Sequence, residues 1–226
     1  MPFHAFLYSG GVMSDLGTLG GDGSSANGIN NAGQVVGGSN RSDGASHAFM
    51  YSGGVMSDLG TLGGGGSGAS GINNAGQVVG SSETGDGTVH AFLYSDGVMS
   101  DLGTLGGNES YAFGINDARQ VVGYSNRSDG TFHAFMYSGG VMSDLGSLGT
   151  FGGTDFTFSF SVALGINNAG YVVGKSLFSG AFLYDGNAML DLNAFVPFGS
   201  GLFLDAAVAI NDVGQIVGSG LTVSGE

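Results

Sequence analysis

The stretch HAFLYSGGVMSDLGTLGG, residues 4–21, returns almost unchanged three times along the chain and decides the fold. Its His-Ala-Phe triplet begins at residues 4, 47, 90 and 133, a constant spacing of 43 residues. A second stretch, INNAGQVVG at residues 29–37, recurs with its Ile at positions 72, 115, 166 and 210, so the two stretches alternate. A fifth, altered copy of the first stretch is GAFLY at residues 180–184. A fixed period of this length indicates a repeat architecture.

Each period contains four short strand candidates, which are HAFLY, VMSDL, the segment ending in GIN, and QVVG. They are rich in β-branched and aromatic residues and are bounded by Gly, Asn or Ser, which is typical of strands. Ser-Gly-Gly joins the first two candidates and Asn-Ala-Gly joins the last two, as tight turns. No segment shows the apolar period of a helix. Four strands per repeat of this length are typical of a propeller blade.

The sequence therefore predicts an all-β fold, a single five-bladed β-propeller of four-stranded antiparallel blades over residues 1–226. Within a blade we expect the order GIN, QVVG, HAFLY, VMSDL, with the GIN strand innermost because small residues precede it. The N-terminal strand pair at 3–17 would then complete the blade begun by 205–219, which closes the ring and leaves no free sheet edge. The alternative phase, with HAFLY innermost, gives five blades without this closure.

Composition and charge exclude several classes of partner. The chain has no cysteine, so it has neither disulfides nor thiolate metal sites. Four basic and eighteen acidic residues give a net charge of −14, which repels phosphate backbones, so we expect no nucleic-acid partner. No run of about 18 apolar residues is present, so we expect no membrane insertion. The N-terminal residues show neither the basic region nor the apolar run of a signal peptide.

The paired motifs HAFLYSGGVMSDLGTLGG and GINNAGQVVGGS resemble the bacterial HAF-repeat family of extracellular repeat proteins. The resemblance covers essentially the whole chain. It departs at the Tyr that follows HAFL or HAFM, where Trp is common in the family, and at Gly180, which replaces the His. The resemblance implies a propeller-like domain, export, and an extracellular or cell-surface location, and it brings no defined activity. Because no signal peptide is visible, a cytoplasmic location stays the alternative.

Two residue types recur in every full copy of the first motif. Tight turns should lie on one face of the disc, and the longer LGTLGG and SNRSDGAS connections on the other, where binding residues usually lie. We predict a ligand-binding role on that face for the repeated His and Asp, namely His4, His47, His90, His133, Asp15, Asp58, Asp101 and Asp144. The structural alternative is that each Asp accepts N–H bonds from the next turn and each His orients a loop.

The repeat symmetry fails at one place in particular. The third and fourth GIN motifs are 51 residues apart, and the excess lies in TFGGTDFTFSFSVAL, residues 150–164. Phe156, Phe158 and Phe160 alternate there with polar residues. They would form an apolar platform for a sugar ring, an acyl chain or a partner protein, or else fill a gap in irregular packing. Residues 193–205 are a second irregular, Phe-containing connection.

Metal and catalytic motifs are weak. Residues 40–44 and 126–130, NRSDG in both copies, resemble half of a calcium loop, but an Arg interrupts each and no bidentate Glu follows. We therefore predict no metal site and no cofactor, with calcium at these loops as the alternative. No Gly-x-Ser-x-Gly elbow occurs, so no catalytic residue is assigned.

These observations favour a monomeric recognition module of an exported bacterial protein. Near-identical blades would offer repeated weak sites, and repetition converts weak contacts into avidity. Asp, Asn, His and aromatic faces are the usual partners of sugars, so we expect a glycan or another small neutral ligand on the long-loop face. The first alternative is a glycoside or ester hydrolase with one asymmetric site near residues 150–164. The second alternative is a structural spacer.

Overall fold

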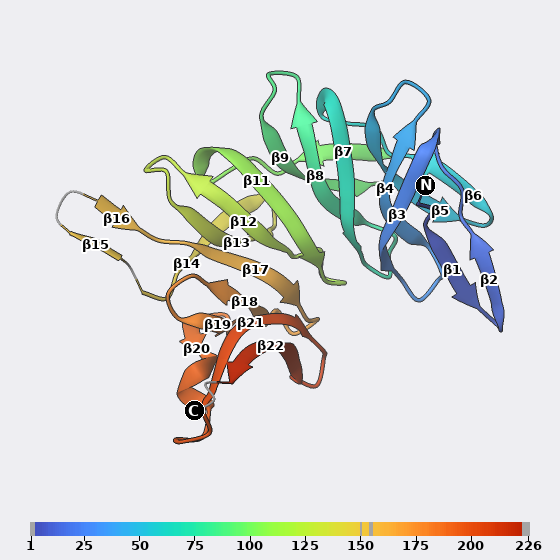
Figure 1. The fold of residues 1–226 in the computed structure, drawn as a ribbon. Helices are drawn as coiled ribbons and strands as arrows, with labels where there is room; N and C mark the ends of the chain where they lie inside the picture. The colour runs from blue at the N-terminus through green and yellow to red at the C-terminus, as the bar shows by residue number, and fades with distance from the viewer. Residues whose placement is uncertain (1–2, 150, 154–155, 223–226) are drawn as a thin grey trace. The chain divides into compact units, whose positions relative to one another are not determined.

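The structure is a computed structural model that describes residues 3–149, 151–153 and 156–222, with the backbone alone for 151–153 and 156–158. Most of the described residues lie in strands and the one helix among them is the short 3₁₀ helix η1 (Leu192–Phe195), which confirms the predicted all-β class. The chain divides into two compact units, the first Met1–Gly103 with Asn108–Asp117, the second Thr104–Gly107 with Ala118–Glu226 (Figure 1).

The first unit holds the strands of the first two and a half repeats. They are β1 (Phe6–Ser9), β2 (Val12–Asp15), β3 (Gly20–Ile29), β4 (Val35–Arg41), β5 (Ser46–Ser52), β6 (Val55–Asp58), β7 (Gly63–Ile72), β8 (Val78–Thr84), β9 (Val89–Ser95), β10 (Val98–Asp101) and most of β11 (Gly106–Ile115).

The second unit holds the remaining strands and one short helix. They are β12 (Val121–Arg127), β13 (Phe132–Ser138), β14 (Val141–Gly146), β15 (Phe151–Gly153), β16 (Phe156–Phe158), β17 (Ser161–Ile166), β18 (Val172–Ser176), β19 (Gly180–Tyr184), β20 (Met189–Asp191), the 3₁₀ helix η1 (Leu192–Phe195), β21 (Leu202–Ile210) and β22 (Ile216–Thr222).

The sheet order confirms the predicted phase of the repeat. β3, β4, β5 and β6 pair in sequence order as one four-stranded antiparallel sheet, and β17, β18, β19 and β20 do the same. In both sheets the strand that ends in GIN comes first and the counterpart of VMSDL comes last. The turn between β5 and β6 is formed by Gly53 and Gly54, both at positive φ.

The expectation of long connecting loops was wrong. Gly20 and Gly21, expected to belong to the LGTLGG connection, already lie in β3, so the predicted strand that ends in GIN is ten residues long, and β7 is its equivalent. Residues 59–62 alone therefore connect β6 to β7, and residues 42–45 connect β4 to β5. The glycines are needed for close strand pairing rather than for a loop. An added Cβ on Gly21, for instance, would lie 2.6 Å from the Arg41 carbonyl oxygen of β4.

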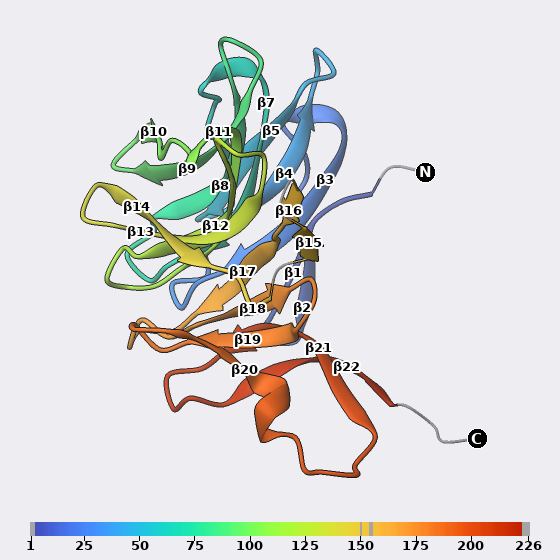
Figure 2. The ribbon, with the colours of Figure 1, turned by 90° about the vertical axis from the view of Figure 1, so that its left-hand side faces the viewer.

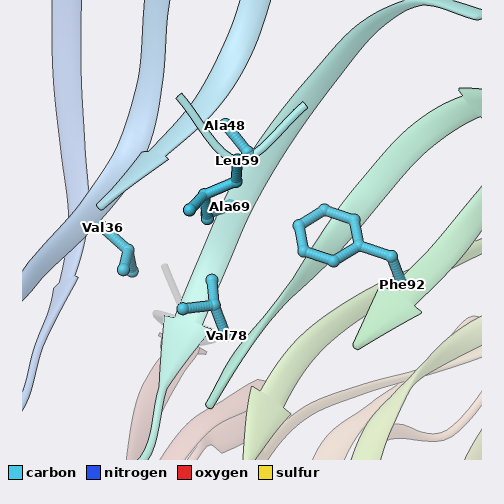
Figure 3. Close-up of a cluster of buried hydrophobic side chains, with 6 residues drawn as sticks. All are labelled: Val36, Ala48, Leu59, Ala69, Val78 and Phe92. Atoms are coloured by element: carbon cyan, nitrogen blue, oxygen red, sulfur yellow. The ribbon is translucent and has the colours of Figure 1, made fainter. Parts of the chain in front are cut away.

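The core is built around the phenylalanine in the second to fifth copies of the first motif. Phe49, Phe92, Phe135 and Phe182 are fully buried. In one cluster, Phe92 packs with residues of both β3–β6 and β7–β10, which are Val36, Ala48, Leu59, Ala69 and Val78 (Figure 3). Neighbouring sheets of one unit are thus joined by apolar side chains from both.

The irregular connections fall in the second unit. The insertion forms the antiparallel pair β15–β16, and the residues after β20 form η1, which packs against β19 and β21 (Figure 2). Asp191 is the N-cap of η1 and accepts a hydrogen bond from the Asn193 N–H. No helix among the described residues is long and apolar enough to cross a membrane.

A closed ring of five separate blades is not seen. A parallel bridge from Glu109 to Val89 links β11 directly to β9, so the sheets are not five independent ones. In the described part of the chain, β1–β2 and β21–β22 each form a two-stranded sheet of their own, rather than one joined blade. Sequence periodicity sets the strands of a repeat, but it does not set how the first and last strand pairs are joined.

Candidate functional site

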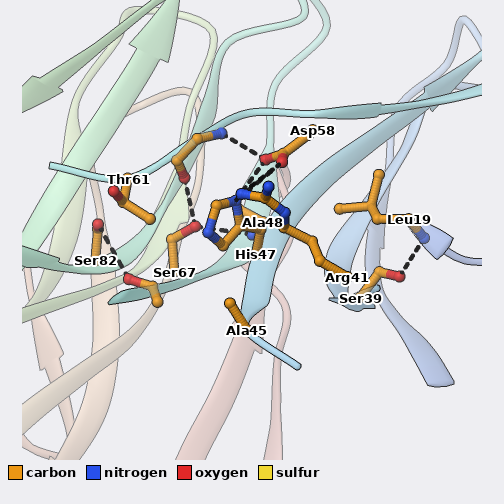
Figure 4. A network of polar contacts seen from close by, with 12 residues as sticks. Leu19, Ser39, Arg41, Ala45, His47, Ala48, Asp58, Thr61, Ser67 and Ser82 are labelled. Carbon is orange, nitrogen blue, oxygen red and sulfur yellow. Dashed lines mark hydrogen bonds and ion pairs between the residues drawn. The ribbon is translucent and has the colours of Figure 1, made fainter. Parts of the chain in front are cut away.

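The predicted His and Asp residues are brought together in pairs. Each His lies in or just before the third strand of its repeat, each Asp lies in the fourth, and antiparallel pairing places them side by side. The distance from His Nδ1 to the nearer Asp carboxylate oxygen is 2.7–2.8 Å in all four pairs, which are His4–Asp15, His47–Asp58, His90–Asp101 and His133–Asp144. Figure 4 shows the pair of the second repeat.

Each of these carboxylates also has the structural role that the sequence suggested. Asp58 accepts a hydrogen bond of 2.8 Å from the Gly60 N–H, and the Asp of each other pair binds the equivalent glycine. The Asp thus anchors its own turn and orients the imidazole. The backbone of the same segment is fixed independently, because the Leu59 N–H donates to the Ala48 carbonyl.

Hydrogen bonds lower the pKa of two of these carboxyl groups. Burial alone would raise the pKa of Asp144, but the bonds from His133 and from the Gly146 N–H outweigh it and lower the pKa. At Asp15 the Gly17 N–H and then His4 lower the pKa. A carboxylate at Nδ1 accepts a hydrogen bond from the Nδ1–H, which leaves the lone pair of the ring on Nε2.

The NRSDG loops place an arginine on two of these pairs. Arg41 Nη1 lies 3.7 Å from Asp58, and Arg127 Nε lies 3.3 Å from Asp144. Each guanidinium also reaches the Asp of its own loop, at 3.3 Å in the first loop and 3.2 Å in the second. The arginine thus supplies the positive charge that a calcium ion would bring. No group of three or more His, Asp or Glu among the described residues is arranged to hold a metal ion.

The fifth repeat lacks the pair. Gly180 stands at the His position at a φ of +77°, and Asp191 instead caps η1. Asn193 fills the space, since its amide donates to the Ser179 and Leu204 carbonyls. The loss of His is therefore compensated structurally, and the repeated polar site is limited to four repeats.

The predicted aromatic platform is only partly described. The side chains of Phe156 and Phe158 lie outside the described residues. The ring of Phe160 packs with Tyr124 and Phe132, at centroid distances of 6.3 Å and 6.2 Å, so it belongs to an aromatic cluster of β12, β13 and the insertion. Neither Tyr124 nor Phe132 was predicted, because their contact depends on the backbone pairing of Phe132 with Ser159 and Phe160.

The residue that sequence reasoning missed is Ser159. Its hydroxyl lies 2.5 Å from Nε2 of His133, on the side of the ring opposite Asp144. The hydroxyl of Ser147 lies 2.6 Å from that of Ser159. The sequence signal was the insertion itself. The strand that ends in GIN contains a serine that binds a backbone N–H, and in this repeat it is Ser161. Ser159 lies two positions before it, where other repeats carry Gly65 or Asn108.

The second unit also contains an apolar cavity of about 520 Å³. Its walls come from β19, η1, β21, β22 and the connection before β21, and include Ala181, Leu192, Ala207, Ile216 and Gly218. Residues of the Phe-containing connection at 193–205 therefore line a cavity.

Comparison with known proteins assigns the chain to no family. No protein-family model matches the chain, and no curated protein is significantly similar to it.

Proposed function

We propose that the chain is a recognition module for neutral glycans, carried on a five-bladed propeller that closes through its first and last strand pairs. The single observation that carries the recognition role is the His–Asp pair with a partly exposed carboxylate, present in four repeats.

The core clusters support closure. Five buried residues form one cluster with Phe92, and they lie at positions 36, 48, 59, 69 and 78. The equivalent positions of the last two repeats also cluster, and they are Val173, Ala181, Leu192, Ala207 and Ile216. This second cluster lacks its phenylalanine, and the cavity of about 520 Å³ is lined by four of the same five residues. A buried apolar site without its aromatic is expected to be filled by a matching side chain.

Phe6 is the matching side chain. It is the phenylalanine of the first His-Ala-Phe triplet, and it is 61% exposed where its four counterparts are fully buried. Val217, in the last strand β22, shows the same difference. Its side chain is 62% exposed, whereas the equivalent Val36 is fully buried. In complete sheets the phenylalanine pairs with a strand glycine, as Phe92 does with Gly80. That register would place Phe6 opposite Gly218.

The carboxylates support the recognition role. The side chains of Asp15 and Asp101 are 63% and 42% exposed while they are held by His4 and His90. A fixed, ionised acceptor with its outer lone pairs in water suits the hydroxyl donors of a sugar. The net charge of −14 disfavours anionic ligands, so a neutral glycan is the class that fits.

Isothermal titration calorimetry with glycans selected on an array tests this role. We expect several equivalent weak sites per chain, and Asp58→Asn together with Asp101→Asn should reduce their number. Asp191→Asn is the matched control, because Asp191 has no His partner. Absence of binding to any neutral glycan, or a stoichiometry unchanged in the double variant, would contradict the proposal and leave the spacer role. Export from the cell is a separate expectation, tested by locating the protein in its host.

A further inference from the structure

We propose that Ser159, His133 and Asp144 form a nucleophilic serine site that cleaves carboxylic esters. The three side chains are in line: the Ser159 hydroxyl is 2.5 Å from Nε2 of His133, and Nδ1 is 2.7 Å from Asp144. A nucleophile, a base and a group that orients the base are recognised by this geometry, whatever the fold. The proposal is independent of glycan recognition.

Proton positions follow from the partners. The Asp144 carboxylate accepts a hydrogen bond from the Nδ1–H of His133, so Nε2 has a lone pair directed at the Ser159 hydroxyl. Ser159 therefore donates its proton toward the base, which is the orientation that an attack requires. The Gly146 N–H, at 2.7 Å from Asp144, and Arg127 hold the carboxylate in place.

The surroundings differ from those of the other His–Asp pairs. His133 and Ser159 are each 7% exposed, so their hydrogen bond is shielded from water. Among the described residues, Nε2 of His90 has only Thr88, at 3.4 Å, and no described side chain is bonded to Nε2 of His47. The insertion thus converts one of four similar pairs into a three-residue arrangement.

Two neighbours suit an acyl substrate. The Ser147 hydroxyl, 2.6 Å from Ser159, is a donor within reach of the oxygen that becomes negative when a carbonyl is attacked. The ring of Phe160 follows Ser159 in the chain and belongs to the aromatic cluster with Tyr124 and Phe132, an apolar surface for the acyl group.

The proposed reaction has two steps, which are acylation of Ser159 and hydrolysis of the acyl-serine. The Ser159 oxygen bonds to the ester carbonyl carbon and its proton passes to Nε2 of His133. The carbon–alkoxide bond then breaks, and His133 returns the proton to the departing alcohol. Water next attacks the acyl-serine and gives a proton to Nε2. The bond to Ser159 breaks, Ser159 regains the proton, and the carboxylic acid leaves.

A fluorophosphonate probe tests the site without any variant, because it bonds only to an activated serine. We expect a single adduct in the intact mass of the wild-type protein, assigned to Ser159 by fragmentation, and turnover of p-nitrophenyl acetate and butyrate.

Matched variants separate this role from a structural one. Ser159→Ala and His133→Asn should each lower ester turnover by at least about tenfold and abolish the adduct. Ser57→Ala, which removes an exposed serine of β6 that the proposed site does not use, should leave both unchanged. Circular dichroism verifies that each variant is folded. An unlabelled, folded wild-type protein, an adduct elsewhere, or full turnover by Ser159→Ala would each overturn the proposal.

Discussion

Phe6→Ala is the sharpest test of whether the chain closes on itself. Phe6 is 61% exposed, and its counterpart Phe92 is fully buried. If Phe6 contacts nothing beyond its own unit, about two fifths of its side chain is buried, and losing that burial costs about 1 kcal/mol. If it fills the cavity beside Ile216 and Ala207, removing it should cost about 3–5 kcal/mol, the usual loss for a core phenylalanine.

Equilibrium unfolding in urea measures the difference, with Phe92→Ala as the reference for full burial. For a chain of this size, a loss of 3–5 kcal/mol lowers Tm by roughly 6–20 °C. We expect Phe6→Ala to lie near Phe92→Ala on both scales. A double-mutant cycle with Ile216→Ala should then give an interaction energy of at least about 1 kcal/mol. A Phe6→Ala loss of about 1 kcal/mol or less, with no coupling to Ile216, would refute closure.

Three further outcomes follow from local contacts. Ser110→Ala should cost about 2–4 kcal/mol in urea unfolding, because its buried hydroxyl bonds one backbone N–H and one carbonyl, and both would lose their partner; a loss below about 1 kcal/mol would show that water replaces it. Gly80→Ala should prevent soluble expression or strongly lower Tm, since the added Cβ would overlap the Gly68 carbonyl oxygen; a wild-type Tm would disprove this packing. The Asp144 pKa is lowered from 3.8 by folding, so its contribution is complete above that value and is lost as pH falls through the lower folded pKa. Acid unfolding of Asp144→Asn should therefore show a weaker dependence on pH below about 4 than the wild type, and an identical profile would contradict the assignment.

Much of the local structure could be predicted from repetition. The β-branched and aromatic residues of HAFLY and QVVG, and the turn residues between strands, were enough to place the strands and their order. The repeated His and Asp were predicted to lie on one face, and the antiparallel strands β5 and β6 bring positions 47 and 58 together. The direct Nδ1 contact depends on side-chain rotamers and could not be read from spacing.

The start of the strand that ends in GIN was placed too late. Gly20 and Gly21 of LGTLGG were taken to belong to a connection, whereas β3 already begins at Gly20 and lies very close to its neighbour there. Glycine permits both outcomes, and only the partner strand decides between them. Ser159 was missed for a related reason. Its partner, His133, is 26 residues away, and the register of an irregular insertion carries no repeat signal.

The turn asparagines of the GIN motifs carry a consequence for how the number of repeats can change. The Asn30 amide donates to the Asn73 carbonyl and Asn73 in turn to Asn116, while Asn167 donates to Asn211. Each link is therefore the same bond between consecutive copies and points in one direction along the chain. Excising or duplicating one whole 43-residue copy would regenerate this bond at the new junction, so lengthening by gene duplication would conserve every junction of this type.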